Sequence, residues 1–309
     1  MAVRGKGLCT FVDYATQAYL GLVGMIVLCW HGRAFADWPL LVAAHVAGIA
    51  AIHLLVRLNA ARPGIRILEF IRHFYPVLLY GPLYCETGWL NHLFIAGFLD
   101  APLIRLDARI FGLQPSLALM ERLPWLAVSE VLYAAYFSYY LMIAGVGLAL
   151  FLRNRGQFFH YLSVVSFVFY VCYFIFIFTP VIGPRIFFKE FGDHPLPADL
   201  VPAQAPDFPA AVQAGTFFKV MACIYRNFEE PGAAFPSSHV AIAITTVFFS
   251  FLYLRRIRWV HFAVMILLCT ATVYCRYHYA VDVFAGILAA SVLVPLGNRL
   301  YFRFQTSRS

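Results

Sequence analysis

Long hydrophobic stretches alternate with short polar segments along most of this chain. Each stretch approaches the roughly 20 residues that an α-helix needs to cross a bilayer. The third stretch is interrupted by charged residues and by Pro76 and Pro82, so six or seven spans is an alternative count. The pattern predicts an all-α, polytopic membrane helical bundle with about eight transmembrane helices. The predicted spans are residues 14–31, 38–57, 68–85, 128–152, 158–180, 237–254, 259–276 and 279–298.

The composition places these stretches in a membrane and not in a soluble core. Of the 309 residues, 62% are hydrophobic and only 12% are charged, which is too apolar for a water-soluble domain. Arg4 and Lys6 precede the first stretch and no small-residue cleavage site follows it, so we interpret it as a retained anchor. The seven cysteines form no CxxC pair, which favours small core residues over a metal site or a disulfide framework.

Basic residues are distributed unevenly around the predicted spans. With eight spans and a cytoplasmic N-terminus, the cytoplasmic side holds 14 of the 23 Lys and Arg residues, and its balance is +12 against −4 on the other side. This agrees with the positive-inside rule. The net charge of +8 therefore reflects membrane topology, and we predict no nucleic-acid partner. We predict an integral protein of the cell (inner) membrane, with both termini in the cytoplasm and the active site on the extracytoplasmic side.

One short polar segment, His278-Tyr279-Ala280-Val281-Asp282, stands where the last hydrophobic stretch begins. Residues four apart share a face of a helix, so Asp282 can accept a hydrogen bond from the His278 ring. Such a carboxylate fixes the imidazole tautomer and leaves the other ring nitrogen ready to attack phosphorus or to take a proton. The alternative is a buried histidine whose hydrogen bond to an acid is only structural.

A second segment, Phe235-Pro236-Ser237-Ser238-His239, stands where another hydrophobic stretch begins, and its His239 is 39 positions before His278. The free N–H groups and the positive dipole end of a helix lie in its first turn, which favours phosphate binding without a metal. We therefore predict that Ser237 and Ser238 bind phosphate.

Two longer segments are expected on the same, extracytoplasmic side as these motifs. The first, residues 181–236, begins with Gly183-Pro184-Arg185 and ends at the His239 segment. The second, residues 86–127, has the pattern of one or two amphipathic helices lying at the membrane surface. Its polar residues are either part of a site or simply a solvated face. They include Asn91, His92, Asp100, Arg105, Asp107 and Arg109.

The two histidine segments together resemble a known family. Residues 235–239 (FPSSH) and 278–286 (HYAVDVFAG) are similar to the second and third signature motifs of the type-2 phosphatidic acid phosphatase superfamily. The H-Y-x-x-D-x-x-x-G form resembles the branch that contains fungal inositol phosphorylceramide synthase and sphingomyelin synthase. The likeness covers about residues 68–298 and implies a six-helix core that uses no metal. It also implies that His278 is the nucleophile, Asp282 its orienting carboxylate and His239 the general acid.

The basic residues depart from that family pattern. Thr272 stands where the third motif usually has an arginine, and Arg276 is two residues before His278. The first motif is not cleanly present; Lys219 and Arg226 have its spacing, but we prefer Arg185. A planar guanidinium can compensate the charge of a transferred phosphoryl group bidentately. We predict that Arg185 and Arg276 bind phosphate. The alternative for Arg276 is that its side chain only snorkels to the membrane interface.

These features predict a membrane enzyme that acts on a lipid phosphate through a phospho-histidine intermediate. Water as second nucleophile makes it a phosphatase, and a lipid hydroxyl makes it a head-group transferase of the inositol phosphorylceramide synthase type. A membrane transporter is a second alternative, because His45, His53 and Arg57 in the second span resemble an ion relay.

The predicted organisation has three parts. Residues 1–67 form two N-terminal transmembrane helices, residues 68–298 a phosphatase-like catalytic core, and residues 299–309 a basic cytoplasmic tail. The expected partners are a lipid phosphate substrate and membrane lipids. No cofactor is predicted, and no metal.

Overall fold

The computed structural model describes residues 8–31, 36–190, 207–228 and 230–307. These ranges are mainly helical, with irregular connections and one isolated parallel bridge between Val181 and Ala233. The helices within the described ranges are α1 (Phe11–Trp30), α2 (Trp38–Ala61), α3 (Arg66–Leu90), α4 (Asp100–Phe111), α5 (Pro115–Arg122), α6 (Leu126–Arg153), α7 (Arg155–Phe178), α8 (Pro184–Glu190), α9 (Ala210–Gln213), α10 (Thr216–Phe228), α11 (Ser238–Tyr253), α12 (Arg258–Tyr274) and α13 (Ala280–Thr306).

The predicted fold class, an all-α polytopic membrane bundle, is confirmed. Among the described residues, five helices are long and apolar enough to cross a membrane: α1, α2, α6, α7 and α13. Two further apolar helices, α11 and α12, are shorter. Every predicted span therefore corresponds to a helix, while the number of eight crossings stays a prediction.

The third predicted span is longer and more continuous than its sequence indicated. Proline removes a backbone donor and tends to break a helix, yet α3 runs from Arg66 to Leu90 through both Pro76 and Pro82. Neighbouring helices can support such a segment within a bundle, and α3 packs against α2 and α7. Pro76 itself is buried.

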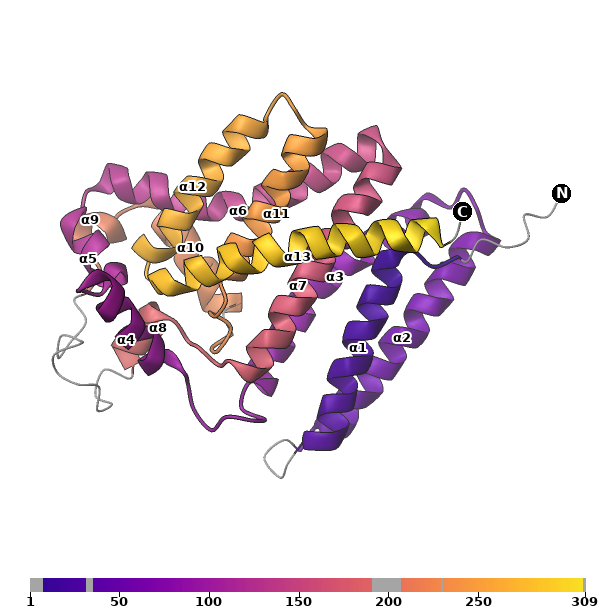
Figure 1. Ribbon diagram of the computed structural model, residues 1–309, viewed down its shortest axis with the longest axis horizontal. Helices are drawn as coiled ribbons and strands as arrows, with labels where there is room; N and C mark the ends of the chain where they lie inside the picture. The colour runs from indigo at the N-terminus through magenta and orange to yellow at the C-terminus, as the bar shows by residue number, and fades with distance from the viewer. Residues whose placement is uncertain (1–7, 32–35, 191–206, 229, 308–309) are drawn as a thin grey trace.

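Helix α7 is the centre of the bundle. It packs against α1, α3, α6, α11 and α13, and most of its side chains are buried. α1 and α2 lie side by side as an antiparallel pair next to this centre (Figure 1). A buried ion pair of 2.5 Å between Asp13 of α1 and Arg72 of α3 attaches the pair to the rest.

The C-terminal helix reaches back to the N-terminal pair. Aromatic rings of α13 contact α1, with 6.2 Å between the ring centroids of Phe11 and Tyr301. α13 continues to Thr306, so residues 299–306 of the expected tail are helical. The three-part division of the chain stays a prediction.

The short helices gather at one end of the bundle, where α4, α5, α8 and α9 lie at the left in Figure 1. Hydrogen bonds join the segment that follows α3 to the segments that follow α7 and α10. The Leu99 N–H donates to the Pro180 carbonyl at 2.7 Å, and the Asn91 amide donates to the Pro231 carbonyl at 2.6 Å. The loops that sequence analysis expected on one membrane side therefore meet at one end of the protein.

Candidate active site

His278 lies in the tight connection between α12 and α13. The backbone N–H groups of Tyr277 and His278 both donate to the Thr272 carbonyl, at 3.1 and 3.0 Å, which fixes the loop against the last turn of α12. The His278 Nδ1 lies 3.4 Å from the Asp282 Oδ2, and both side chains are buried. The structure thus brings the predicted pair together and holds one ring nitrogen beside the carboxylate.

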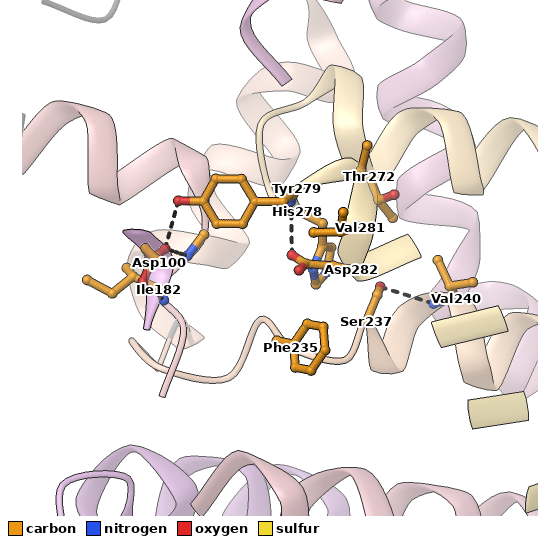
Figure 2. Close-up of polar contacts among 12 residues, drawn as sticks. Asp100, Ile182, Phe235, Ser237, Val240, Thr272, His278, Tyr279, Val281 and Asp282 are labelled. Atoms are coloured by element: carbon orange, nitrogen blue, oxygen red, sulfur yellow. Dashed lines mark hydrogen bonds and ion pairs between the residues drawn. The ribbon is translucent and has the colours of Figure 1, made fainter. Parts of the chain in front are cut away.

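The Asp282 carboxylate has a second contact that comes from its place in the helix. It stands in the first turn of α13, and its Oδ2 accepts a hydrogen bond of 2.9 Å from the Tyr279 N–H (Figure 2). This interaction satisfies a donor that a helix start would otherwise leave unpaired. One oxygen therefore both caps α13 and faces the imidazole, so the orientation of His278 depends on how that turn is formed.

The second predicted histidine begins a neighbouring helix. Ser237 is the N-cap of α11, and its hydroxyl oxygen accepts a hydrogen bond of 3.4 Å from the Val240 N–H (Figure 2). The Ser237 N–H donates to the Asp282 carbonyl at 3.2 Å, which joins the starts of α11 and α13. As a result, the ring centroids of His239 and His278 lie 5.6 Å apart.

A glycine explains how the two helix starts approach so closely. A Cβ atom at Gly286 would lie 2.6 Å from the Ser237 carbonyl oxygen and 2.9 Å from the Val240 Cβ. No side chain fits between them. The glycine of the HYAVDVFAG segment therefore permits the contact that sets the spacing of the histidines.

The two predicted arginines take different positions. The Arg185 guanidinium lies 5.1 Å from the Tyr225 ring centroid and 5.7 Å from that of Tyr277, the residue before His278. The Arg276 guanidinium lies 4.9 Å from the Phe208 ring centroid, on a residue whose φ of 62° is left-handed. Burial lowers the pKa of Arg276 from its usual value. The contacts thus bring Arg185 beside the His278 loop and Arg276 against the segment before α9.

One wall of the site is formed by tyrosines that were not among the predicted site residues. Tyr136 and Tyr139 of α6 lie against His239, with ring centroids 5.0 and 4.6 Å away. Tyr225 of α10 stacks on Tyr277 at 4.1 Å and is hydrogen-bonded to Tyr136 through the two hydroxyls. Aromatic residues from three separate segments therefore lie around His239 and the Arg185 guanidinium.

The polar residues of segment 86–127 were predicted to be either part of a site or a solvated face. For Asp100 and Asp107 the solvated-face interpretation is wrong, because both are completely buried, whereas Arg105 and Arg109 are exposed. Burial raises the pKa of both aspartates, while their hydrogen-bond donors act in the opposite direction. Their spacing of seven residues puts them on one face of α4, which is the signal that was available in the sequence.

The family model of the PAP2 superfamily matches residues 101–296, which is more than half of the chain. The chain belongs to this superfamily, the class of membrane protein to which its two histidine segments pointed. No curated protein and no solved structure matches the chain.

Proposed function

We propose that this protein is a lipid phosphate phosphatase or phosphotransferase that works through a phospho-histidine intermediate. The observation that carries the proposal is the pairing of two histidines at adjoining helix starts, 5.6 Å apart by ring centroid, with a buried carboxylate 3.4 Å from one of them. Membership of the PAP2 superfamily supports the same chemistry.

In the proposed first step, His278 attacks phosphorus. With its Nδ1 proton held toward Asp282, its Nε2 carries the lone pair that forms the P–N bond. The bond from phosphorus to the leaving oxygen breaks, and His239 gives that oxygen a proton. Arg185 and the first turn of α11, with Ser237 and Ser238, compensate the charge on the other phosphate oxygens. We assign Arg276 a secondary phosphate contact.

In the second step, an acceptor hydroxyl attacks the phosphorylated histidine. His239 takes the acceptor proton, the P–N bond breaks, and both histidines return to their starting states. Water as the acceptor gives hydrolysis. A lipid hydroxyl gives head-group transfer, which the resemblance to the inositol phosphorylceramide synthase and sphingomyelin synthase branch favours.

The test is an assay of the purified protein with a panel of lipid phosphates, with and without ceramide or diacylglycerol. Release of free phosphate identifies a hydrolase, and formation of a new phospholipid identifies a transferase. Turnover of none of the panel, together with solute uptake into proteoliposomes, would establish the transporter alternative instead.

His53 and Arg57 are exposed while His45 is buried 3.0 Å from Glu86, which disfavours a continuous relay along α2.

Activity in this assay is expected to persist in EDTA. In the described ranges, no group of three or more His, Cys, Asp and Glu side chains is arranged to hold a metal ion. The proposed mechanism compensates phosphate charge with Arg185 and backbone N–H groups. The measurement is the initial rate before and after dialysis against EDTA; a rate that collapses and returns with Mg²⁺ contradicts the metal-free mechanism.

The active site is proposed to face away from the cytoplasm. Cys223 is exposed on α10 at the site end and reports its side of the membrane. In a Cys29→Ser background, a membrane-impermeant thiol reagent should label Cys223 in right-side-out vesicles and leave it unlabelled in inverted ones. Arg256→Cys in a Cys29→Ser, Cys223→Ser background is the matched control and should show the reverse. Labelling of Cys223 in inverted vesicles alone would overturn the topology.

A further inference from the structure

Helix α4 contacts both segments that carry the proposed chemistry. The Asp100 carboxylate accepts three hydrogen bonds, each of 2.8 or 2.9 Å. Two come from the backbone N–H groups of Ile182 and Gly183, just before Arg185, and the third comes from the Tyr279 hydroxyl, just after His278 (Figure 2). A single buried carboxylate therefore bridges the arginine segment and the nucleophile segment.

The same segments touch directly at Gly183. Its φ of +90° is left-handed, and a Cβ atom there would lie 2.6 Å from the Tyr277 carbonyl oxygen. Only glycine meets both conditions without strain. The Asp100 bridge thus spans two pieces of backbone that are already in van der Waals contact, and it determines their relative position.

Asp107, two turns further along α4, binds the start of α13. Its carboxylate oxygens accept the Ala280 and Val281 N–H groups at 2.9 and 3.0 Å. Together with the Tyr279 N–H held by Asp282, these bonds satisfy three successive donors of the first turn. The first turn of α13, which places Asp282 beside His278, is therefore held both by Asp107 of α4 and by Asp282 of α13 itself.

This arrangement has an electrostatic consequence. The start of a helix attracts anions, and both α11 and α13 begin at the site. At α13 the buried Asp107 carboxylate already occupies that position. A substrate phosphate is thereby left to the first turn of α11, next to His239 and within reach of attack by His278.

We propose that Asp100 and Asp107 are positioning residues for phosphoryl transfer: α4 holds the Arg185 segment, the His278 loop and the first turn of α13 in the relative positions that the reaction needs. This inference rests on the proposed function. Neither aspartate contacts the histidines in the bonds described, so both act through the backbone and through Tyr279.

The first test is Asp107→Asn, which keeps the size of the side chain but replaces one acceptor oxygen by a donor. Displacing reacting groups by about 1 Å can cost on the order of 100-fold in rate, so we expect kcat per folded enzyme to fall about 10- to 100-fold, with KM changed less than about twofold. Hydrogen–deuterium exchange should rise in residues 275–286 and stay unchanged elsewhere. Arg105→Gln, an exposed change on the same helix, is the matched control and should leave both measurements unchanged.

The second test is Tyr279→Phe, which removes only the hydroxyl that donates to Asp100 and leaves the two backbone bonds of that carboxylate. We expect a smaller fall in kcat, about 3- to 10-fold, since one of three bonds is lost. This variant keeps the inference testable if Asp107→Asn does not fold.

The outcomes separate a positioning role from a structural one. Unchanged kcat per folded enzyme in the variants overturns the inference, even if they melt at lower temperature, because the aspartates then support only the fold. Unchanged exchange in residues 275–286 of Asp107→Asn overturns it as well. Wild-type protein that turns over no lipid phosphate contradicts the proposed function itself, which is a distinct result.

Discussion

Replacing His278 by alanine is expected to abolish turnover of every substrate. The variant has no imidazole to form the P–N bond, so no phospho-enzyme can accumulate, and a better leaving group cannot restore a step that lacks its nucleophile. The measurement is the steady-state rate on a lipid phosphate and on p-nitrophenyl phosphate. It is combined with trapping of the acid-labile phospho-histidine after rapid mixing.

Asp282→Asn is the graded comparison for this result. The imidazole stays, but its tautomer and orientation are no longer fixed, and the cap on the Tyr279 N–H is weakened. Its rate should lie between those of the wild type and His278→Ala, with some trapped intermediate. A His278→Ala enzyme that still forms a stable phospho-enzyme would show that another residue is the nucleophile.

Replacing His239 by alanine is expected to lower the rate by about 10² to 10⁴-fold on a lipid phosphate, the usual range for loss of a general acid. The deficit should shrink on p-nitrophenyl phosphate, whose leaving group departs without a proton. The ratio of the two rates, variant over wild type, is the quantity to compare between substrates.

His160→Gln is the matched control for this substrate dependence. His160 is a buried histidine near the start of α7. Its Nδ1 lies 2.7 Å from the Tyr253 hydroxyl, and its Nε2 lies 2.7 Å from the Asn298 Oδ1. It lies about 27 Å along α7 from the site loops, estimated at 1.5 Å per residue. Its variant should show the same ratio on both substrates. If p-nitrophenyl phosphate restores His278→Ala and not His239→Ala, the roles of nucleophile and acid are reversed.

Only the structure reveals why α4 matters to these results. The bonds of Asp100 and Asp107 join residues 82 to 179 positions apart in the chain. A spacing of seven residues indicates that the two side chains share a helix face, but it does not indicate what that face contacts. Hydrophobicity alone favours the solvated-face interpretation, since carboxylates are rarely buried without partners. The partners here are four backbone N–H groups and the Tyr279 hydroxyl, and the backbone donors are not encoded by any side-chain pattern.

The sequence by itself determined the features whose physics is local. Apolar stretches long enough to span a bilayer predicted an all-α membrane protein, and a four-residue spacing predicted that Asp282 would face His278. A serine before an apolar stretch predicted the start of α11. Tertiary structure decided the rest: the continuity of α3 through two prolines, the place of Arg185 beside stacked tyrosines, and the bracing of the site by α4. These depend on contacts between distant segments, whose geometry follows from how the whole bundle packs.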